Sequence, residues 1–157
     1  MSAVATITRL AIVNRGAAAM RLLNAAREYA AEHQRDIQIV AIHTEADARA
    51  LFVREADFAV RVDGPISVDN LTAVAAALTL AGVDGAWVGW GPLAQQPAFA
   101  EMCAHLGITN VGLSAATLTS IGDRSVLQSA AESAGGNLSS LEIVEHGGPA
   151  GGGVGVV

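Results

Sequence analysis

Short apolar runs alternate along the chain with longer segments of helical periodicity. The first run, Arg9–Asn14, is short and apolar, and the second, Ile37–His43, is rich in β-branched residues. Strands of this composition are usually covered on both faces. Between the two runs, apolar residues recur every three or four positions, as on one face of a helix. These residues are Ala19, Leu22, Leu23, Ala26 and Ala30.

The same alternation continues to about residue 134. It predicts further strands at Phe58–Val62, Val83–Trp90 and Ile108–Gly112, and further helices at Asp47–Glu55, Val68–Ala81, Pro97–Leu106, Ser114–Ile121 and Asp123–Ala134. Repeated strand–helix alternation indicates a parallel sheet with helices on both faces, joined by right-handed crossovers. The expected fold is therefore a Rossmann-like α/β open sheet.

The composition changes after Ala134, where glycine and serine become frequent. Six of the last twelve residues are glycine, and one possible strand, Leu141–His146, precedes them. We expect one domain over residues 1–134 and a glycine-rich tail over residues 135–157, because the tail is too short for a second domain.

Charge and cysteine content narrow the classes of function. The net charge is −6, with 15% charged and 52% hydrophobic residues, which favours a globular protein that binds neither nucleic acid nor an anionic membrane. Apolar runs are too short to span a membrane and the N-terminus lacks a signal-peptide pattern, so the expected location is the cytoplasm. A single cysteine, Cys103, argues against a disulfide or a multi-cysteine zinc site, and no metal site is predicted.

Ligands of open parallel sheets bind at the carboxyl ends of the strands. At the first such end, Asn14, Arg15 and Gly16 turn the chain directly into a helix, whose free N–H groups could hold an anion. Neither a dinucleotide fingerprint nor a P-loop is present. The simpler interpretation is a tight turn in which Arg15 pairs with a nearby carboxylate.

Several segments together resemble a known family. AIVNRGAAAMRLLNAARE, VAIHTEADARALFVREADFAV and WVGWGPLAQQPAFAEMCAHLGITNVGLSAATLTSIGDR are similar, in order and spacing, to the N-terminal domain of biotin carboxylase, over about residues 9–134. That family is the ATP-dependent carboxylating component of acetyl-CoA, propionyl-CoA and pyruvate carboxylases. The resemblance implies a pre-ATP-grasp domain that packs against the ATP-grasp halves and dimerises through its first helix. ATP, Mg²⁺ and biotin are the family's cofactors.

Three sets of residues are carried over by this resemblance. The biotin-side cleft comprises Asn14, Arg15, Gly16, Gly89, Trp90 and Gly91. The interface of the first helix comprises Arg21, Asn24, Arg27 and Glu28. The weaker candidates for contact with ATP phosphates are Arg124, His146, Gly151, Gly152 and Gly153.

The third set depends on two substitutions. Arg124 stands for a phosphate-binding lysine and keeps its charge in a planar geometry. His146 stands for the lysine of the family's ATP-grasp lid, whose glycine-rich loop the tail resembles. A low-complexity tail explains that second likeness equally well.

Other positions depart from the family pattern. Ala17 replaces a glutamate, Phe52 replaces a histidine, and Trp87 and Val88 replace a His-Pro pair. Ionisable groups thereby become apolar. Because the resemblance also implies that nearly all catalytic groups of the family lie beyond this domain, we expect no catalytic residue and no cofactor in the isolated chain. The favoured function is a non-catalytic interaction or scaffold subunit of a biotin-dependent acyl-CoA carboxylase system, which binds a carboxylase subunit or a second copy of itself. The alternative is a fragment or split piece of an ATP-dependent biotin carboxylase that needs an ATP-grasp partner chain.

A third function, an independent nucleotide-binding Rossmann module, is disfavoured because no glycine fingerprint follows the first strand.

Two further predictions concern the burial of the tryptophans and of the cysteine. One of Trp87 and Trp90 should lie in the core and the other should line a cleft. Cys103 should be buried and inert beside Phe99 and Leu106.

Overall fold

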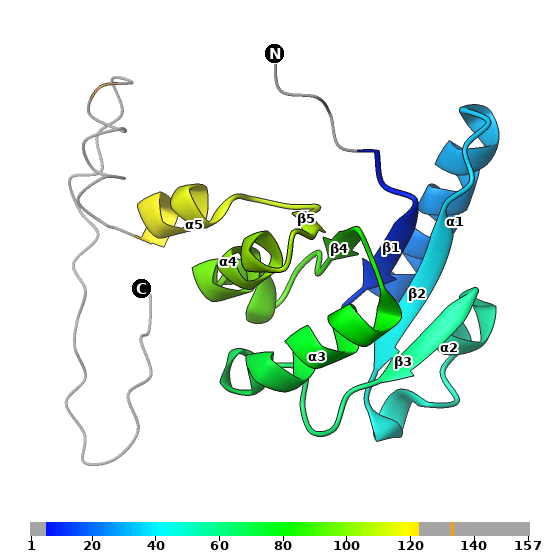
Figure 1. Ribbon diagram of the computed structural model, residues 1–157, viewed down its shortest axis with the longest axis horizontal. Coiled ribbons are helices and arrows are strands. Elements are labelled where there is room, and N and C mark those ends of the chain that lie inside the picture. The colour runs from blue at the N-terminus through cyan, green and yellow to red at the C-terminus, as the bar shows by residue number, and fades with distance from the viewer. Residues whose placement is uncertain (1–5, 123–132, 134–157) are drawn as a thin grey trace, which may run out of the picture. The chain divides into compact units, whose positions relative to one another are not determined.

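Five parallel strands form one sheet in the order β3-β2-β1-β4-β5 (Figure 1). The computed structural model describes residues 6–122 and residue 133. The strands are β1 (Arg9–Ile12), β2 (Gln38–His43), β3 (Phe58–Arg61), β4 (Gly85–Trp87) and β5 (Thr109–Asn110). The helices are α1 (Gly16–Glu32), α2 (Leu51–Glu55), α3 (Leu71–Ala81), α4 (Pro97–His105) and α5 (Ala115–Gly122), with 3₁₀ turns η1 (Glu45–Asp47), η2 (Val68–Asn70) and η3 (Leu93–Gln95).

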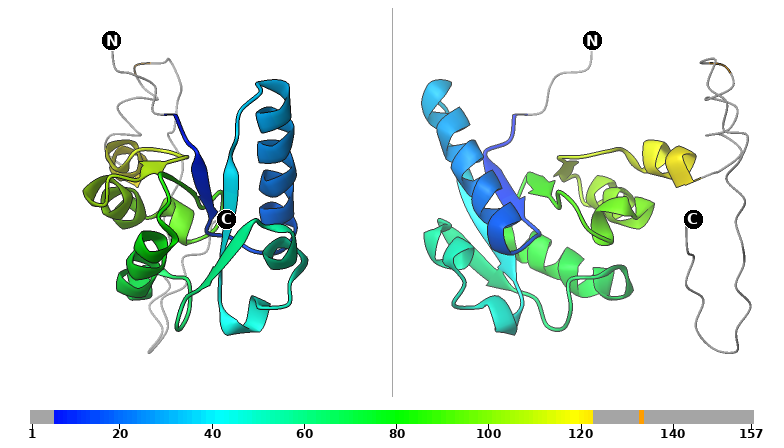
Figure 2. Two further views of the ribbon diagram at one scale, coloured as in Figure 1. Left: turned by 45° about the vertical axis from the view of Figure 1, so that its right-hand side comes forward. Right: turned by 180° about the vertical axis from the view of Figure 1, so that it is seen from behind.

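Helices cover both faces of the sheet: α1 and α2 lie on one face, and α3 and α4 lie on the other (Figure 2). Successive side chains of a strand point to opposite faces of the sheet. Leu10 and Ile12 therefore pack in the core beneath α1 and α2, whereas Ala11 and Val13 pack in the core beneath α3 and α4. The predicted fold class, a Rossmann-like open parallel sheet, is confirmed.

The first compact unit of the chain ends at Thr119, so the whole sheet and helices α1 to α4 belong to it. No helix among the described residues is both long and apolar enough to cross a membrane. The predicted boundary near residue 135 and the predicted helix Asp123–Ala134 lie outside the described ranges, apart from Ser133.

Several predicted elements are shorter than expected, and in two of them single backbone dihedral angles interrupt the element. The predicted helix Asp47–Glu55 is a 3₁₀ turn followed by α2, since Ala50 is extended with φ −64° and ψ 152°. The predicted strand Val83–Trp90 is reduced to β4, and Gly89 beyond it has a φ of +70°, which is outside the strand region.

The prediction that Cys103 is buried is confirmed, and Leu106 lies next to it, since the Leu106 N–H donates to the Cys103 carbonyl oxygen at 3.1 Å. Cys103 and Phe99 are buried in the core beneath α4, and burial raises the pKa of the Cys103 thiol to about 11. Leu106 is exposed because α4 ends at His105 and Leu106 forms its C-cap.

At the amino edge of the sheet, the side at which the strands begin, hydrogen bonds to one carboxylate join two strands. Asp84 accepts hydrogen bonds from the Thr8 hydroxyl at 2.6 Å and from the backbone N–H groups of Thr8 and Arg9 at 3.0 and 2.9 Å. Partial burial by itself raises the pKa of Asp84, but these hydrogen bonds outweigh it, so the pKa lies below its ordinary value. Asp84 therefore ties the start of β1 to the start of β4.

Candidate functional site

A cleft of about 570 Å³ opens at the carboxyl ends of the strands. The chain leaves β1 toward α1 on one face and leaves β4 toward α4 on the other, and neighbouring strands with this divergence form a binding crevice in open α/β sheets. The polar residues that line the cleft include Asn14, Arg15, Thr44, Asp47, Ser67 and Asp69. The apolar ones include Phe52, Val68, Val88, Trp90, Pro92 and Leu93.

Asn14 joins the two sides of this crevice. Its Nδ2 donates to the carbonyl oxygens of Val88 at 2.7 Å and Trp90 at 3.2 Å, and its Oδ1 accepts from the N–H of Arg15 at 2.7 Å. One side chain after β1 therefore holds the loop after β4.

The loop after β4 presents an aromatic side chain to solvent. Trp90 lies between Gly89 and Gly91, whose φ angles are +70° and +113°, and its side chain is 73% exposed. A Cβ at Gly89 would overlap Cζ2 of Trp87, so this position requires glycine for space as well as for φ. Trp87 is half-buried and packs against the core beneath α1 and α2.

The basic group of the cleft is paired with a carboxylate. Arg15 Nη2 lies 2.8 Å from Asp47 Oδ1, and the two side chains are 72% and 13% exposed. This is the pairing that the tight-turn interpretation predicts. Because the positive charge is neutralised at this distance, the turn has little net attraction for an anion.

A second arginine at the same edge is also paired. Arg61 lies 2.7 Å from Glu45 and 3.3 Å from Asp63, and these carboxylates raise the pKa of its guanidinium, the Glu45 hydrogen bond contributing most. Glu45 and Asp47 therefore act as ion-pair partners in this fold.

The six predicted cleft residues are not all brought together. Asn14, Arg15, Trp90 and Gly91 line the cleft. Gly89 lines a smaller neighbouring cavity instead. Gly16 begins α1 with a φ of +61° and is not among the cleft-lining residues.

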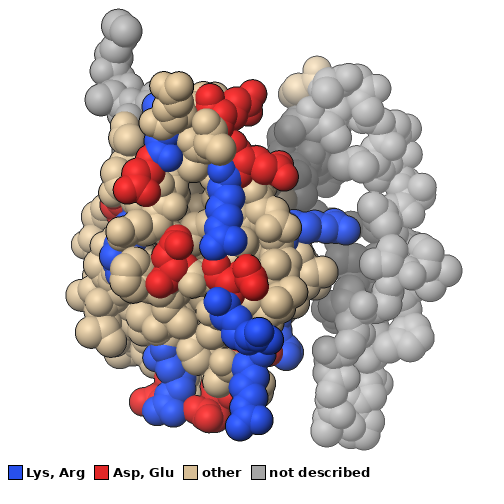
Figure 3. Space-filling view, turned by 90° about the vertical axis from the view of Figure 1, so that its right-hand side faces the viewer, with Lys and Arg blue, Asp and Glu red and all other residues tan. Residues whose placement is uncertain are grey.

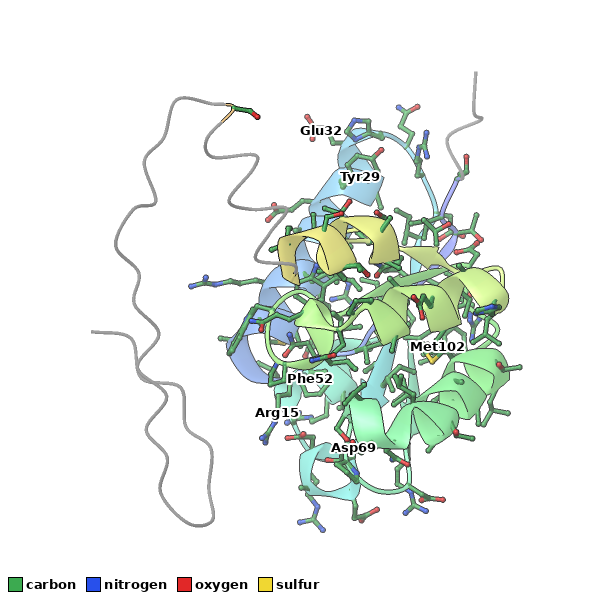
Figure 4. The ribbon with its side chains drawn as sticks, turned by 90° about the vertical axis from the view of Figure 1, so that its left-hand side faces the viewer. Arg15, Tyr29, Glu32, Phe52, Asp69 and Met102 are labelled. Atoms are coloured by element: carbon green, nitrogen blue, oxygen red, sulfur yellow. The ribbon has the colours of Figure 1, made fainter. Side chains whose placement is uncertain are left out.

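Most of the cleft lining was missed from the sequence, including Phe52 and Asp69. Figure 4 shows Arg15, Phe52 and Asp69 at one edge of the domain, although they come from the β1–α1 turn, α2 and η2. Asp69 follows β3, whose carboxyl end lies at the same edge, and this was the available signal for it. Phe52 was noted only as a departure from the family pattern.

The histidines of the described region are engaged in local contacts. His43 is buried and its Nδ1 lies 2.9 Å from the Thr44 carbonyl oxygen, while His33 and His105 bond to carbonyl oxygens one turn earlier in α1 and α4. No group of three or more His, Cys, Asp or Glu side chains that could hold a metal occurs in this part of the chain.

The predicted interface residues all lie exposed on α1: Arg21, Asn24, Arg27 and Glu28. Arg27 also reaches the end of α2, where its guanidinium donates to the Glu55 carbonyl and lies 3.9 Å from the Glu55 carboxylate. Seen from the side on which α1 lies, arginine and acidic side chains are interspersed (Figure 3). The ATP-phosphate candidates Arg124, His146, Gly151, Gly152 and Gly153 fall outside the described residues.

Comparison with known proteins agrees with this geometry. The family described as biotin carboxylase, N-terminal domain, matches residues 6–118. Biotin carboxylase 1 of Bacillus subtilis is 34% identical over 148 residues, covering 89% of this chain and 32% of the relative. The biotin carboxylase of Halalkalibacterium halodurans is 31% identical over 133 residues, covering 81% of this chain and 27% of the relative.

Solved structures give the same result. A single-chain, multi-domain long-chain acyl-CoA carboxylase is similar with a TM-score of 0.74 and 29% identity, covering 86% of this chain and 14% of that one. The biotin carboxylase domain of a thermophilic 2-oxoglutarate carboxylase bound to bicarbonate has a TM-score of 0.73 and 27% identity, covering 83% and 29%. This chain spans about a third or less of the length of these relatives. The chain belongs to the biotin carboxylase N-terminal domain family.

Proposed function

We propose that this chain is a protein-binding subunit of a biotin-dependent acyl-CoA carboxylase system and does not itself catalyse carboxylation. One observation supports this most strongly: the mouth of the cleft is apolar and carries Trp90 at 73% exposure. A large exposed aromatic side chain in such a setting is typical of a contact that a partner covers.

The charges of the cleft support the non-catalytic part of the proposal. Arg15 is the one basic residue among those lining it and is held by Asp47, while Asp69 adds a further negative charge. Phosphoryl transfer requires cationic groups aimed at the transferring phosphate, and activation of bicarbonate requires charge stabilisation of the same kind. The described cleft offers neither.

The family's cofactors fit this cleft unequally. ATP and Mg²⁺ need an unpaired cation or a set of acidic ligands, which the described lining does not supply. The uncharged ureido group of biotin is planar and could lie against the exposed face of Trp90. In the family, biotin carries the carboxyl group, and Trp90 would here serve only to bind the ring.

A second surface supports binding to a carboxylase chain or to a second copy of this one. Arg21, Asn24 and Glu28 are exposed on α1, and their side chains have no hydrogen bond or ion pair within the described residues. Both charge signs are present, so two copies of the helix can pair in antiparallel fashion without like-charge repulsion.

The alternative function is a split piece of an ATP-dependent biotin carboxylase that works with an ATP-grasp partner chain. It is favoured by the built geometry of the cleft loops, since Asn14 and the two glycines around Trp90 form an ordered wall. Such a wall is of use to an enzyme whose remaining groups come from another chain.

A capture experiment tests the protein-binding function. Tagged chain should capture a carboxylase subunit, and Trp90→Ala should weaken the capture about tenfold or more, as expected for a central aromatic contact. Leu80→Ala, at a side chain that is 80% exposed on α3, is the matched control and should leave capture unchanged. Equal capture by the Trp90 and Leu80 variants would contradict the proposal.

Measurements of phosphate release and carboxylase activity distinguish the split-enzyme function from the non-catalytic one. The isolated chain should release no phosphate from ATP in response to biotin and bicarbonate, above the level of a Gly16→Asp variant. If the captured complex loses its carboxylase activity with the Gly16→Asp chain while capture persists, the split-enzyme function is correct and the non-catalytic one is wrong.

A further inference from the structure

Two asparagine amides hold opposite walls of the cleft in the same way. Asn14 donates from one Nδ2 to two carbonyl oxygens in the loop after β4, those of Val88 and Trp90. Asn70 donates from one Nδ2 to two carbonyl oxygens in the loop after β3, those of Asp63 at 2.9 Å and Pro65 at 2.8 Å. Each wall is therefore tied by a side chain that belongs to another segment.

The wall that carries Trp90 depends strongly on its tie. The side chain of Trp90 is 73% exposed, so packing contributes little to its position. The flanking residues, Gly89 and Gly91, have more backbone freedom than any other residue type. The Trp90 carbonyl oxygen, in contrast, is bonded directly to Asn14 at 3.2 Å.

Asn14 is itself oriented. Its Oδ1 accepts the N–H of Arg15 at 2.7 Å, so Nδ2 faces the carbonyl oxygens of the β4 loop. The amide supplies an acceptor on one side and two donors on the other, and no carboxylate or hydroxyl of similar size can do both.

We propose that Asn14 is a positioning residue: it holds the backbone of the loop after β4 at Val88 and Trp90, and through this backbone it keeps the Trp90 indole at the mouth of the cleft. Its use in partner binding rests on the proposed function, but the positioning itself is a property of the free chain. The experiment therefore uses the full chain without a partner, so its outcome does not depend on whether the proposed function is correct.

The test is Asn14→Asp, which keeps the shape and the acceptor for Arg15 but removes both donors. In a Trp87→Phe background, where Trp90 is the sole tryptophan, the amplitude of its fast local rotation in fluorescence anisotropy decay should rise about twofold, because a released exposed side chain reorients on the nanosecond scale. Asn70→Asp has the same chemistry on the opposite wall and should leave the Trp90 signal unchanged.

A second measurement avoids the Trp87 substitution. In the chain with both tryptophans, the indole N–H resonance of Trp90 is identified by its loss in Trp90→Phe, and its heteronuclear NOE should fall in Asn14→Asp but not in Asn70→Asp. Far-ultraviolet circular dichroism verifies that each variant is folded. An unchanged Trp90 signal in a folded Asn14→Asp chain, or an equal change in Asn70→Asp, would overturn the proposal.

Discussion

The two edges of the sheet use their polar groups differently. At the amino edge, Asp84 directs its carboxylate to Thr8 and Arg9, and Ile7 lies against Gly85. At the carboxyl edge, the Asn14 amide holds a loop that exposes Trp90 beside an apolar cleft. The amino edge thus joins strands, whereas the carboxyl edge keeps a surface open.

This difference indicates where stability and recognition are placed. Contacts at the amino edge are local and satisfied, so substitutions there should change the free energy of unfolding without changing the cleft. Substitutions at the carboxyl edge should alter Trp90 and binding, with effects on unfolding that depend on how tightly the loop is packed.

The largest expected effect is on the carboxyl edge, at Gly89→Ala. The substitution places a side chain at a φ of +70° and against the Trp87 ring, so both strain and overlap arise. The free energy of unfolding, measured by urea titration, should fall by about 3 kcal/mol. The Trp90 fluorescence should change with it.

Gly85→Ala is the matched control on the amino edge. Its new Cβ would meet the branched side chain of Ile7 at 2.8 Å, but no positive φ is involved, so overpacking is the sole cost. The expected loss is about 1 to 2 kcal/mol, smaller than at Gly89. A loss at Gly85 as large as that at Gly89 would show that the loop after β4 is not specially constrained.

The second effect is Asp84→Asn, on the amino edge. The amide that replaces the carboxylate cannot accept all the hydrogen bonds from Thr8 and Arg9. The free energy of unfolding at pH 7 should therefore fall by about 2 kcal/mol. In the Trp87→Phe background, Trp90 fluorescence should not respond.

The same substitution has a pH signature. Because the folded pKa of Asp84 is lowered, its stabilising contribution is present above the pKa of the unfolded chain and is lost as pH falls through the folded pKa. The difference between wild type and Asp84→Asn, in urea titrations from pH 7 downward, should therefore shrink below about pH 4. A difference independent of pH would contradict a role for the ionised carboxylate.

The smallest expected effect is Arg15→Gln. Arg15 is 72% exposed, so solvent screens its pair with Asp47, and the free energy of unfolding should change by less than about 1 kcal/mol. Capture of a partner should change more than unfolding does, since an unpaired Asp47 then faces the cleft. A destabilisation as large as that of Asp84→Asn would remove the contrast between the edges.

The order and type of the main elements could be predicted, because each strand and helix has its own periodicity. The ends of β4 and α2 could not, since they depend on single dihedral angles at Gly89 and Ala50. The pattern of apolar and polar residues does not predict the dihedral angles of a single residue.

The candidate site was predictable in part. Asn14, Arg15 and Trp90 follow strands whose ends meet at one edge, and the resemblance to the family pointed to them. The partner of Arg15 could be expected only as some carboxylate, because naming Asp47 requires that β2 lies beside β1. The cleft wall formed by residues 65–69 could not be predicted, because its position depends on the course of the loop between β3 and α3.

Arg9 has a consequence of another kind, for solubility. Its guanidinium carbon lies 4.1 Å from the centre of the Phe58 ring, across β2, on a strand that pairs only with β2 within the described residues. An apolar side chain on an open strand edge invites pairing with other chains, and a charge over it discourages that pairing. We therefore expect Arg9 to lower the tendency of this strand to pair with other chains in concentrated solution.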